Sequence, residues 1–500
     1  MKSVQEALKE MKGINRKIEH LMSASGLIQW DMRTGAPKKA IADKGEQLAF
    51  LAGEIYKLQT SDTMKELIDL LDGQEDLSDI DRAMVRENKK TYDLTKKVPE
   101  ERMTAYVQAV SDSEAAWEEA KDKNDYATFK PHLKKVIDFQ KELVEYYGYE
   151  GNKYNTMLDI YEPGITVEKL DKIFSELRDA IVELLNKIKD SGVKIDNSFF
   201  KKTFPKEAQE EFSLFVLNKM GYDFDAGRLD ESVHPFTTNF GNKDVRITTK
   251  YLENEFTSAL FSTIHEGGHG IYEQDIPDEL KGTGLAGGVS MGIHESQSRF
   301  YENILARSRE FWTYFYPEAK KRFKVFEEVS FEDFYRGINT VEPSLIRIEA
   351  DELTYSLHII IRYELEKAVI NNEITIEELP EAWKNKYKEY LGVEPQTYAE
   401  GLMQDTHWAS GLLGYFPSYA LGNLYGAQFV NKMKQDLPNM YKDIEEGNLQ
   451  NIHQWLEKNI HKHGGIYTPA ELIKMVTGEE LKAKYFIDYL NEKYSEIYKL

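Results

Sequence analysis

Residues 265–269 read His-Glu-Gly-Gly-His, which matches the pattern H-E-x-x-H. Apolar residues recur one helical turn apart up to this point: Leu252, Phe256, Leu260 and Ile264. This period predicts a helix, on which His265 and His269 lie one turn apart and can share a metal ion. Glu266 is displaced to one side, where it can act as general base toward a metal-bound water. The alternatives are two surface histidines or a chance match, which is expected about 0.04 times per chain of this composition.

A catalytic zinc site needs a third protein ligand and an open position for water. In some metalloproteases the third ligand lies six residues after the second histidine, and here that residue is Asp275. No break signal precedes Pro277, so we expect the helix to continue and Asp275 to point elsewhere. Glu273 shares the ligand face, but it lies about 12 Å from His265 along the helix axis, too far for one ion to bind both histidines and this residue.

A better source of the third ligand follows a Gly-rich stretch, residues 282–292. A second helix is expected to begin there and to carry both His294 and Glu295. Successive helical residues diverge by about 100°, so one of the two binds the ion, and spacing alone does not choose between them. The Gly-rich stretch itself is either an adaptable border of the substrate groove or a rigid turn whose glycines allow close packing.

The segment before the metal helix differs from the rest of the chain. Residues 234–240 and 244–249 are short, β-branched and aromatic, and Gly241-Asn242 lies between them, so we predict a β-hairpin. Its edge can pair with an extended peptide, or the hairpin can be a spacer. His234 at its start is a candidate for hydrogen bonding to substrate or for fixing the hairpin.

The composition bounds the class of protein. The chain has 500 residues, 41% of them hydrophobic, and no cysteine, which excludes disulfides and thiolate ligands and suits a reducing cytoplasm. It lacks the apolar core of a signal peptide and any run that could span a membrane. A net charge of −22 argues against nucleic acid and anionic membranes as partners.

Most of the remaining sequence has helical periodicity. Residues 1–60 are expected to form two helices joined by a polar turn at 29–37, and residues 62–148 to form long charged helices with solvated faces. Further helices are expected at 165–191, 205–221, 344–371 and 376–391. With no repeat and no clear linker, we predict one mainly α-helical unit over residues 1–500, with a small β-sheet beside the site.

Several stretches occur in an order that is similar to the signature blocks of the carboxypeptidase Taq family. They are His234-Pro235-Phe236, Asp244-Val245-Arg246-Ile247-Thr248, the H-E-x-x-H pattern, His294-Glu295-Ser296-Gln297-Ser298, Ile346–Asp351 and Gly401-Leu402-Met403-Gln404-Asp405-Thr406-His407-Trp408. The Trp30-Asp31 stretch near the start also resembles this family, so the resemblance covers nearly the whole chain.

The resemblance implies a metal-dependent carboxypeptidase that releases single C-terminal residues from peptides with broad specificity. It implies one zinc ion per chain, with cobalt able to replace it, and a homodimer. It implies a helical fold like that of neurolysin and angiotensin-converting enzyme, with two lobes around a deep groove. It also selects Glu295 over His294 as the third ligand. Many other zinc peptidases with a glutamate ligand orient a ligand histidine with an Asp four residues after this Glu, and here that position is Arg299, so the acceptor must come from elsewhere.

Catalysis and recognition need further groups. The oxyanion needs a partner besides the metal, and His407 and Tyr419 are the candidates, with simple packing as the alternative for each. A free α-carboxylate is best bound by an arginine fork. Arg347 is the first candidate, with an ion pair to Asp351 as its alternative, and Arg246 is the second.

Two other functions remain open at this point. An endopeptidase or dipeptidyl carboxypeptidase on the same scaffold would lack an arginine placed one residue beyond the scissile bond. A non-catalytic peptide-binding protein would hold a structural metal, and such sites are closed by four protein ligands. No fourth ligand is evident here.

Overall fold

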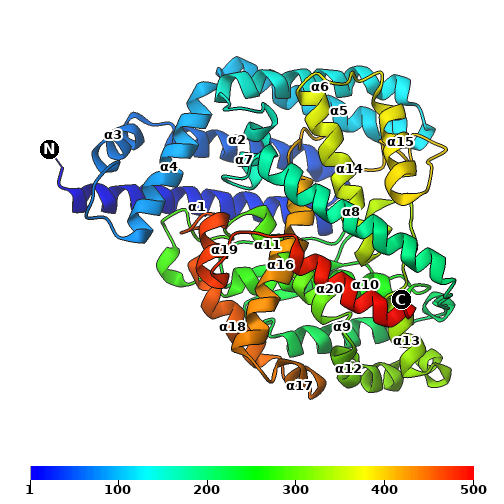
Figure 1. Cartoon of the computed structure of the whole chain (residues 1–500). Coiled ribbons are helices and arrows are strands. Elements are labelled where there is room, and N and C mark those ends of the chain that lie inside the picture. The colour runs from blue at the N-terminus through cyan, green and yellow to red at the C-terminus, as the bar shows by residue number, and fades with distance from the viewer. Residues whose placement is uncertain (1) are drawn as a thin grey trace. The chain divides into compact units, whose positions relative to one another are not determined.

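The computed structural model describes residues 2–500, which fold into two compact units (Figure 1). Unit 1 takes the described part of Met1–Thr95 together with Asp196–Ile338 and Phe429–Glu480. Unit 2 takes Lys96–Ile195, Asn339–Gln428 and Leu481–Leu500. Each unit therefore combines three stretches that are far apart in sequence, and one catalytic unit over residues 1–500 stays a prediction.

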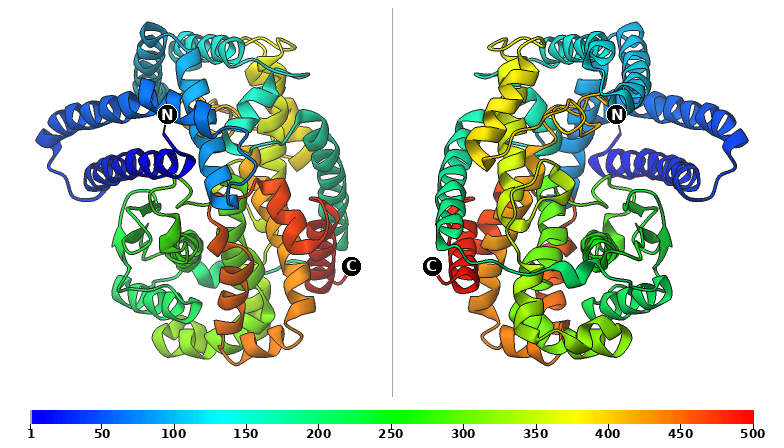
Figure 2. Two further views of the ribbon diagram at one scale, coloured as in Figure 1. Left: turned by 90° about the vertical axis from the view of Figure 1, so that its left-hand side faces the viewer. Right: turned by 90° about the vertical axis from the view of Figure 1, so that its right-hand side faces the viewer.

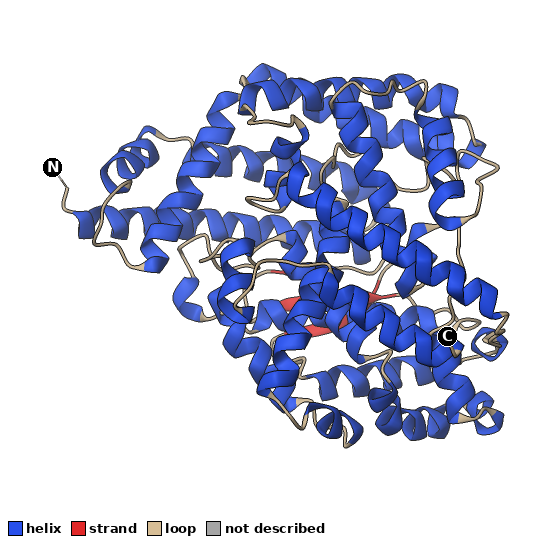
Figure 3. Ribbon diagram, in the orientation of Figure 1, coloured by secondary structure: helices blue, strands red, loops and turns tan. Residues whose placement is uncertain are grey.

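Helices build nearly all of both units, as the sequence predicts, and the only sheet in residues 2–500 is small (Figure 3). The helices of unit 1 are α1 (Val4–Thr34), η1 (Lys38–Ala40), α2 (Ile41–Gln59), α3 (Asp62–Leu71), η2 (Ser198–Lys201), α9 (Lys206–Met220), α10 (Phe256–Gln274), η3 (Asp278–Leu280), α11 (Met291–Arg299), the π-helical η4 (Phe300–Leu305), α12 (Arg309–Arg322), η5 (Lys324–Glu328), α13 (Phe331–Ile338), α17 (Met440–Glu445), α18 (Gln450–Asn459), η7 (His461–His463) and α19 (Pro469–Thr477). The helices of unit 2 are α5 (Glu100–Lys123), α6 (Tyr126–Tyr147), α7 (Tyr154–Tyr161), α8 (Val167–Ser191), η6 (Arg347–Glu349), α14 (Glu352–Ile370), α15 (Leu379–Leu391) and α20 (Lys484–Tyr498). Two helices, α4 (Asp79–Lys97) and α16 (Pro417–Asp436), carry the chain from one unit into the other.

The sheet lies in unit 1 and has the order β1-β3-β2. β2 (Thr237–Asn239) pairs antiparallel with β3 (Val245–Thr249), which is the predicted hairpin. β1 (Gly227–Glu231) pairs parallel with β3 and was missed, because its charged, glycine-led sequence lacks the apolar alternation that marks a strand. On β3 the residues Val245, Ile247 and Thr249 share one face, are fully buried, and pack against α10, while Thr248, which is also buried, binds Phe236 and Ser232.

The metal helix α10 is held at both its start and its middle. Phe256, its first residue, contacts seven aromatic rings: Phe200, Phe204, Phe212, Trp312, Phe323, Phe326 and Phe334. In its middle, a Cβ on Gly268 would lie only 2.8 Å from the Cα of Ser298. Only glycine therefore allows the backbone of α11 to approach α10 this closely.

The core of unit 2 is α14, which is buried on nearly all sides. Burial on every face is what its sequence specifies, since Leu353, Leu357 and Ile361 recur alongside other apolar residues around the helix. The predicted helix at 344–371 begins later than expected. Asp351 is the N-cap and accepts a hydrogen bond from the backbone N–H of Thr354, so Arg347 lies in the short turn η6 before the helix.

The predicted turn at 29–37 also lies elsewhere. Helix α1 continues through Trp30 and Asp31 to Thr34, where Gly35 follows as C-cap. The views in Figure 2 show α1 and α2 side by side as a helical hairpin, joined by the turn at 35–37 and η1. Trp30 is thus a buried helical residue facing the sheet, in contact with Phe236 and Phe240.

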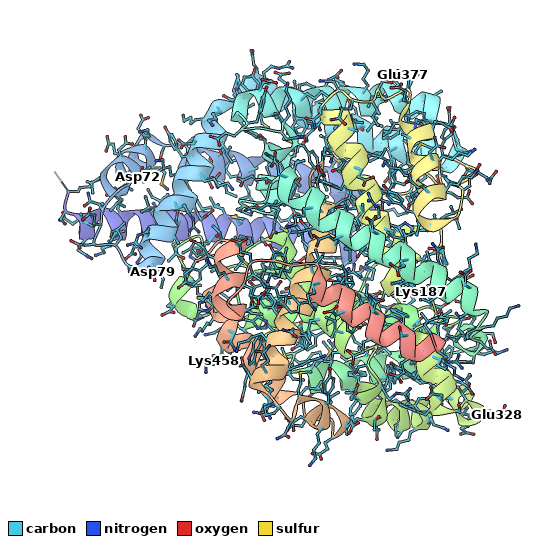
Figure 4. All side chains as sticks on the ribbon, in the orientation of Figure 1. Asp72, Asp79, Lys187, Glu328, Glu377 and Lys458 are labelled. Atoms are coloured by element: carbon cyan, nitrogen blue, oxygen red, sulfur yellow. The ribbon has the colours of Figure 1, made fainter. Side chains whose placement is uncertain are left out.

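Charged side chains cover the surface of each unit. Figure 4 labels examples that are exposed on several helices and loops: Asp72, Asp79, Lys187, Glu328, Glu377 and Lys458. Among residues 2–500 no helix combines the length and the apolar character that crossing a lipid bilayer would require.

Candidate metal centre

Helices α10 and α11 bring together two histidines and one glutamate in unit 1. The Oε2 atom of Glu295 lies 3.7 Å from Nε2 of His265 and 3.5 Å from Nε2 of His269. These three ligand atoms lie within 4.8 Å of one another. Tetrahedral ligands at zinc–ligand distances of about 2.0–2.1 Å are separated by about 3.3 Å, so this donor set fits a zinc ion.

His294, the alternative to Glu295, takes a different position. Its ring contacts the ring of His269, and its Nδ1 lies 2.6 Å from Nδ1 of His269. Its Nε2 lies 2.7 Å from Oε1 of Glu273. Glu273 is thus buried one turn beyond His269, away from the three ligand atoms, as its helical spacing predicts.

The acceptor for His265 is Glu302. Oε2 of Glu302 lies 2.8 Å from Nδ1 of His265, so this nitrogen carries the proton and Nε2 keeps its lone pair for a metal. Glu302 stands in the π-helical segment η4, seven residues after Glu295. Arg299, four residues after Glu295, donates from Nε to Oε1 of Glu295 at 2.7 Å and from Nη1 to Glu302 at 3.2 Å.

Glu266 lies beside this group and is held by the sheet. Its side chain is buried, and its Oε2 accepts a hydrogen bond from the hydroxyl of Thr237 on β2 at 2.6 Å. Burial raises the pKa of Glu266, and the charge of His265 and the Thr237 hydrogen bond oppose this effect. A buried carboxylate whose basicity is raised by desolvation suits the role of a general base.

The electrostatics of the centre favour a cation. Burial alone would raise the pKa of Glu302, but Arg299 and His265 outweigh it and bring the value to about 2. Burial lowers the pKa of His265, yet the charges of Glu295 and Glu302 raise it to about 9, so the local field stabilises positive charge at this ring. For His269 burial dominates and lowers the pKa to about 3, which leaves the ring neutral and able to bind a metal.

The Gly-rich stretch before α11 is anchored to α1. The carboxylate of Glu19 accepts the backbone N–H of Gly282 at 2.7 and 2.8 Å, and Asn15 donates to the carbonyl of Thr283 at 3.2 Å. A Cβ on Gly288 would lie 2.6 Å from the His294 ring. These contacts favour the rigid turn over the adaptable border.

Asp275 points away from the metal ligands, as predicted. It caps the C-terminus of α10, and its carboxylate binds Nε2 of His453 at 2.8 Å and Nδ1 of His461 at 2.6 Å. Nε2 of His461 in turn lies 2.8 Å from Oε1 of Gln297. This buried cluster links the end of α10 to α11, α18 and η7.

Arg347, the first candidate for substrate carboxylate binding, lies in unit 2. It is buried and donates from Nε and Nη2 to Oδ1 of Asp405 at 3.1 and 2.8 Å. Its partner is thus Asp405, whereas Asp351, the alternative considered above, is the cap of α14. Arg362, which is fully buried, binds the other oxygen of Asp405 at 2.8 Å.

The two oxyanion candidates are adjacent to this group. Nε2 of His407 lies 3.3 Å from the hydroxyl of Tyr419, and the guanidinium of Arg347 lies 5.0 Å from the Tyr419 ring centre. Burial lowers the pKa of His407 to about 4, which keeps its ring neutral. The structure therefore brings Arg347, His407 and Tyr419 together within unit 2.

The remaining two candidates lie on the sheet in unit 1. Arg246 on β3 forms a two-bond ion pair with Asp244 at 2.7 and 2.8 Å and packs over Trp30 and Phe240. It borders an open cavity of about 500 Å³. His234 is exposed before β2, and its carbonyl accepts a hydrogen bond from Ser232 at 2.6 Å.

The sequence did not indicate that Thr237, Asn239 and Glu302 support the candidate centre. It also did not indicate that Glu273 binds His294. A signal existed for Glu302, since a residue seven positions after Glu295 returns to the same helical face. From the sequence, Thr237 and Asn239 can be recognised only as alternate residues of a predicted strand. The sequence does not show which helix this side of the strand faces.

Comparison with known proteins agrees with this geometry. The chain matches the model of the family described as carboxypeptidase Taq (M32) metallopeptidase over residues 10–494. It is 50% identical over 494 residues to carboxypeptidase 1 of Bacillus subtilis (strain 168), covering 98% of this chain and 99% of that protein. It is 41% identical over 505 residues to thermostable carboxypeptidase 1 of Thermus thermophilus, with coverage of 98% and 99%.

A solved structure shows the same fold. The crystal structure of an M32 carboxypeptidase from Deinococcus radiodurans R1 matches with a TM-score of 0.96 at 35% identity, over 99% of this chain and 100% of that chain. The predicted resemblance is thereby confirmed, and with it an enzyme that uses a metal to remove residues from peptide C-termini. The chain belongs to the carboxypeptidase Taq (M32) family of metallopeptidases.

Proposed function

We propose that the protein is a zinc carboxypeptidase that releases single C-terminal residues from peptides with broad side-chain specificity. The observation that carries this proposal is the convergence of His265, His269 and Glu295, with Glu266 buried beside them. Two imidazoles and one carboxylate are the donor set of open catalytic zinc sites. We assign one zinc ion per chain, which cobalt can replace.

A zinc ion bound there would supply Lewis-acid polarisation of the scissile carbonyl and activation of a water. Glu266 accepts the proton of the attacking water at the carboxylate oxygen that Thr237 does not occupy. The same residue then passes the proton to the leaving amine. Glu302 keeps the Nδ1 proton of His265 in place, so that Nε2 would be the atom that binds a zinc ion.

Recognition of the free C-terminus is assigned to Arg347. Arg347 and Arg362 share the single carboxylate of Asp405, so this buried group holds two positive charges against one negative charge. Glu366, one turn after Arg362 on α14, interacts with the charge of Arg362, but its carboxylate accepts its hydrogen bonds from other donors: Tyr154, Trp408 and the Gly414 N–H. An uncompensated buried charge is costly, and a substrate carboxylate would compensate it.

Arg347 also has donors left for such a substrate. A guanidinium carries five N–H groups. Two of these bind Asp405 and one binds the hydroxyl of Tyr355 at 2.9 Å. We assign the oxyanion contact to Tyr419 and His407, whose mutual hydrogen bond would orient the Tyr419 hydroxyl.

Arg246 and His234 are assigned to contacts along the peptide. β2 is an edge strand, since the sheet order is β1-β3-β2, and it can extend the sheet with a substrate strand. Arg246 remains the second candidate for the C-terminal carboxylate, although Asp244 already occupies its fork.

The test compares cleavage of a free-acid peptide with cleavage of its C-terminal amide. Wild type should cleave the free acid far faster. Arg347→Lys keeps the charge but loses the fork and should already be impaired. Arg347→Ala should reduce kcat/KM for the free acid by about 10- to 150-fold, the equivalent of losing a contact of roughly 1.5–3 kcal/mol.

Arg102→Ala is the matched control, because Arg102 forms a half-buried two-bond ion pair with Glu142 elsewhere in unit 2. It should leave both rates unchanged. Equal cleavage of acid and amide by wild type would instead identify an endopeptidase. If Arg347→Ala keeps a high ratio of acid to amide cleavage, another residue binds the carboxylate, and Arg246 is the next to change.

The proposal includes three further properties that the family resemblance implies. The first is a homodimer, which light scattering would test. The second is a cytoplasmic location. The third is a two-lobed architecture around a deep groove, like that of neurolysin and angiotensin-converting enzyme. Peptides are its substrates, and with a net charge of −22 we expect no binding to nucleic acid or anionic membranes.

A further inference from the structure

We propose that strand β2 positions two different parts of the catalytic centre through two alternate residues. Thr237 orients the base Glu266, and Asn239 orients the ligand His269 through a chain of two intermediate side chains. This inference rests on the proposed function, since it takes Glu266 as the base and His269 as a zinc ligand.

The backbone places both residues toward α10. Alternate residues of a strand point to the same side, so Thr237 and Asn239 face one way and Thr238 faces the other. Their pairing partners on β3, Ile247 and Val245, are both fully buried. Across the interface, Glu266 and Glu273 are seven residues apart on α10, which returns them to one helical face.

Thr237 leaves Glu266 with one defined reactive oxygen. Its single hydroxyl proton has two possible acceptors on Glu266, the carboxylate Oε2 at 2.6 Å and the backbone carbonyl at 3.1 Å. The shorter contact to an ionised group is the stronger, so the carboxylate takes the proton. Oε2 is thereby occupied, the carboxylate plane is held, and Oε1 remains to accept a proton.

Asn239 starts a second chain, which runs to the metal ligand. Its Oδ1 accepts the backbone N–H of Gly241, which assigns Nδ2 as the atom that donates to Oε2 of Glu273. The other oxygen of Glu273 lies 2.7 Å from Nε2 of His294, and Nδ1 of His294 lies 2.6 Å from Nδ1 of His269.

The chemistry of its members gives this chain one direction. A carboxylate only accepts hydrogen bonds, so Nε2 of His294 must be the donor to Glu273. With His294 as a neutral imidazole, which has one donor and one acceptor, its Nδ1 accepts the proton of His269 Nδ1. His269 is then the tautomer whose Nε2 has a free lone pair, the form that binds a metal.

The two branches predict two different losses. Breaking the first branch leaves all metal ligands intact and misorients the base, so kcat should fall. Breaking the second leaves the base intact and releases His269 from its tautomer and ring orientation, so zinc affinity should fall. A strand that only supported the fold would affect both properties together.

The experiment uses four variants of the full-length protein: Thr237→Val, Thr237→Ser, Asn239→Asp and Thr238→Val. The first removes the hydroxyl at nearly constant volume, and the second restores it. The third keeps the size and the acceptor for Gly241, replaces the amide donor to Glu273 with a carboxyl group, and when ionised adds a negative charge beside Glu273. The fourth is the matched control, a change of the same type on the opposite face of the strand. Circular dichroism verifies folding, competition with a chromophoric chelator gives zinc affinity, and the visible spectrum of the cobalt form reports ligand geometry.

Thr237→Val should lower kcat by at least about 10-fold and change KM and zinc affinity by less than about 2-fold, and Thr237→Ser should restore most of the rate. Asn239→Asp should weaken zinc binding by about 10- to 100-fold and alter the cobalt spectrum, while kcat at saturating zinc changes less than about 3-fold. Thr238→Val should match wild type in every measurement.

Three results would overturn the inference. A folded Thr237→Val with wild-type kcat refutes the first branch, and a folded Asn239→Asp with wild-type zinc affinity and cobalt spectrum refutes the second. If every variant, including Thr238→Val, loses both kcat and zinc affinity, β2 only supports the fold and does not position the two groups separately. If wild type binds zinc but cleaves no peptide, the proposed function fails, while the metal measurements still decide the branch through Asn239.

Discussion

Glu302 offers a sharp test of how the metal centre is built, because its contact with His265 is visible only in the tertiary structure. Its carboxylate accepts the Nδ1 proton of His265 at 2.8 Å and is also bound by Arg299 at 3.2 Å. Glu302→Gln keeps the size of the side chain and one acceptor oxygen but removes the charge. We expect this variant to stay folded and to bind zinc more weakly.

The size of the effect follows from the hydrogen bond that changes. A bond from imidazole to a carboxylate is charge-assisted and contributes about 1.5–3 kcal/mol, roughly twice a neutral one. Replacing it with an amide acceptor also makes His265 a poorer electron donor to the ion. Loss of such a partner typically weakens metal binding by about 10- to 100-fold, and we expect Glu302→Gln to fall in this range.

Arg299 should add to the loss. In wild type it is shared between Glu295 and Glu302. Once Glu302 is neutral, the guanidinium retains only the charge of Glu295, the proposed third ligand. It should draw electron density from that carboxylate and weaken its bond to the ion, an effect in the same direction as the change at His265.

The assay is competition for zinc with a chromophoric chelator at fixed pH, run on wild type, Glu302→Gln and Glu328→Gln. Glu328 is exposed at the surface (Figure 4), so its variant controls for the loss of one negative charge. The cobalt spectrum should change in Glu302→Gln alone. Unchanged zinc affinity in a folded Glu302→Gln protein would show that Glu302 does not support His265, and the reasoning from geometry would be refuted.

Three further predictions concern the base, the loop and the end of the metal helix. Glu266→Gln should retain zinc and lose about 10²- to 10⁴-fold in kcat, and near wild-type turnover would exclude Glu266 as the base. Glu19→Ala should speed hydrogen exchange at Gly282 and Gly284 by at least about 10-fold, because it removes the acceptor of both N–H groups; exchange that is already fast in wild type would contradict a rigid turn. Burial raises the pKa of the Asp275 carboxyl, but the hydrogen bonds and charges of His453 and His461 outweigh this effect and lower the pKa from 3.8 to about 2. Asp275→Asn should therefore lower the free energy of unfolding at pH 7 by about 2 kcal/mol. A lowered pKa of a carboxyl group adds stability that is present above pH 3.8 and is lost as the pH falls through about 2. The difference in the free energy of unfolding between wild type and Asp275→Asn, measured with denaturant, should therefore shrink between these two pH values. A difference that stays constant would refute the ion pair.

Local patterns in the sequence were enough for the central chemical features. The apolar period before His265 predicted helix α10, and the i, i+4 spacing placed His265 and His269 on one face, because helical geometry is set by neighbouring residues. The same reasoning predicted α11 after the Gly-rich stretch and the β2–β3 hairpin. Boundaries were less accurate, as at the end of α1, where the helix continues to Thr34 and ends only at the Gly35 C-cap.

Tertiary structure decided which chemically similar residue does what. The sequence placed His294 and Glu295 on the same helix at adjacent positions and could not choose between them without the family resemblance. The choice depends on how α11 is rotated against α10, and that rotation is set by the close approach at Gly268, a contact between residues 30 positions apart. No local pattern contains this information.

The supporting residues follow the same rule. Glu302 reaches His265 from a π-helical segment, and Thr237 and Asn239 reach α10 from the sheet, so each contact joins elements whose relative placement depends on the packed core of unit 1. The sequence by itself determined the ligand types, the helix that carries the two histidines and the family of the chain. Only the tertiary structure decided the partners that orient those ligands, because hydrogen bonds between distant segments depend on packing that no spacing along the chain encodes.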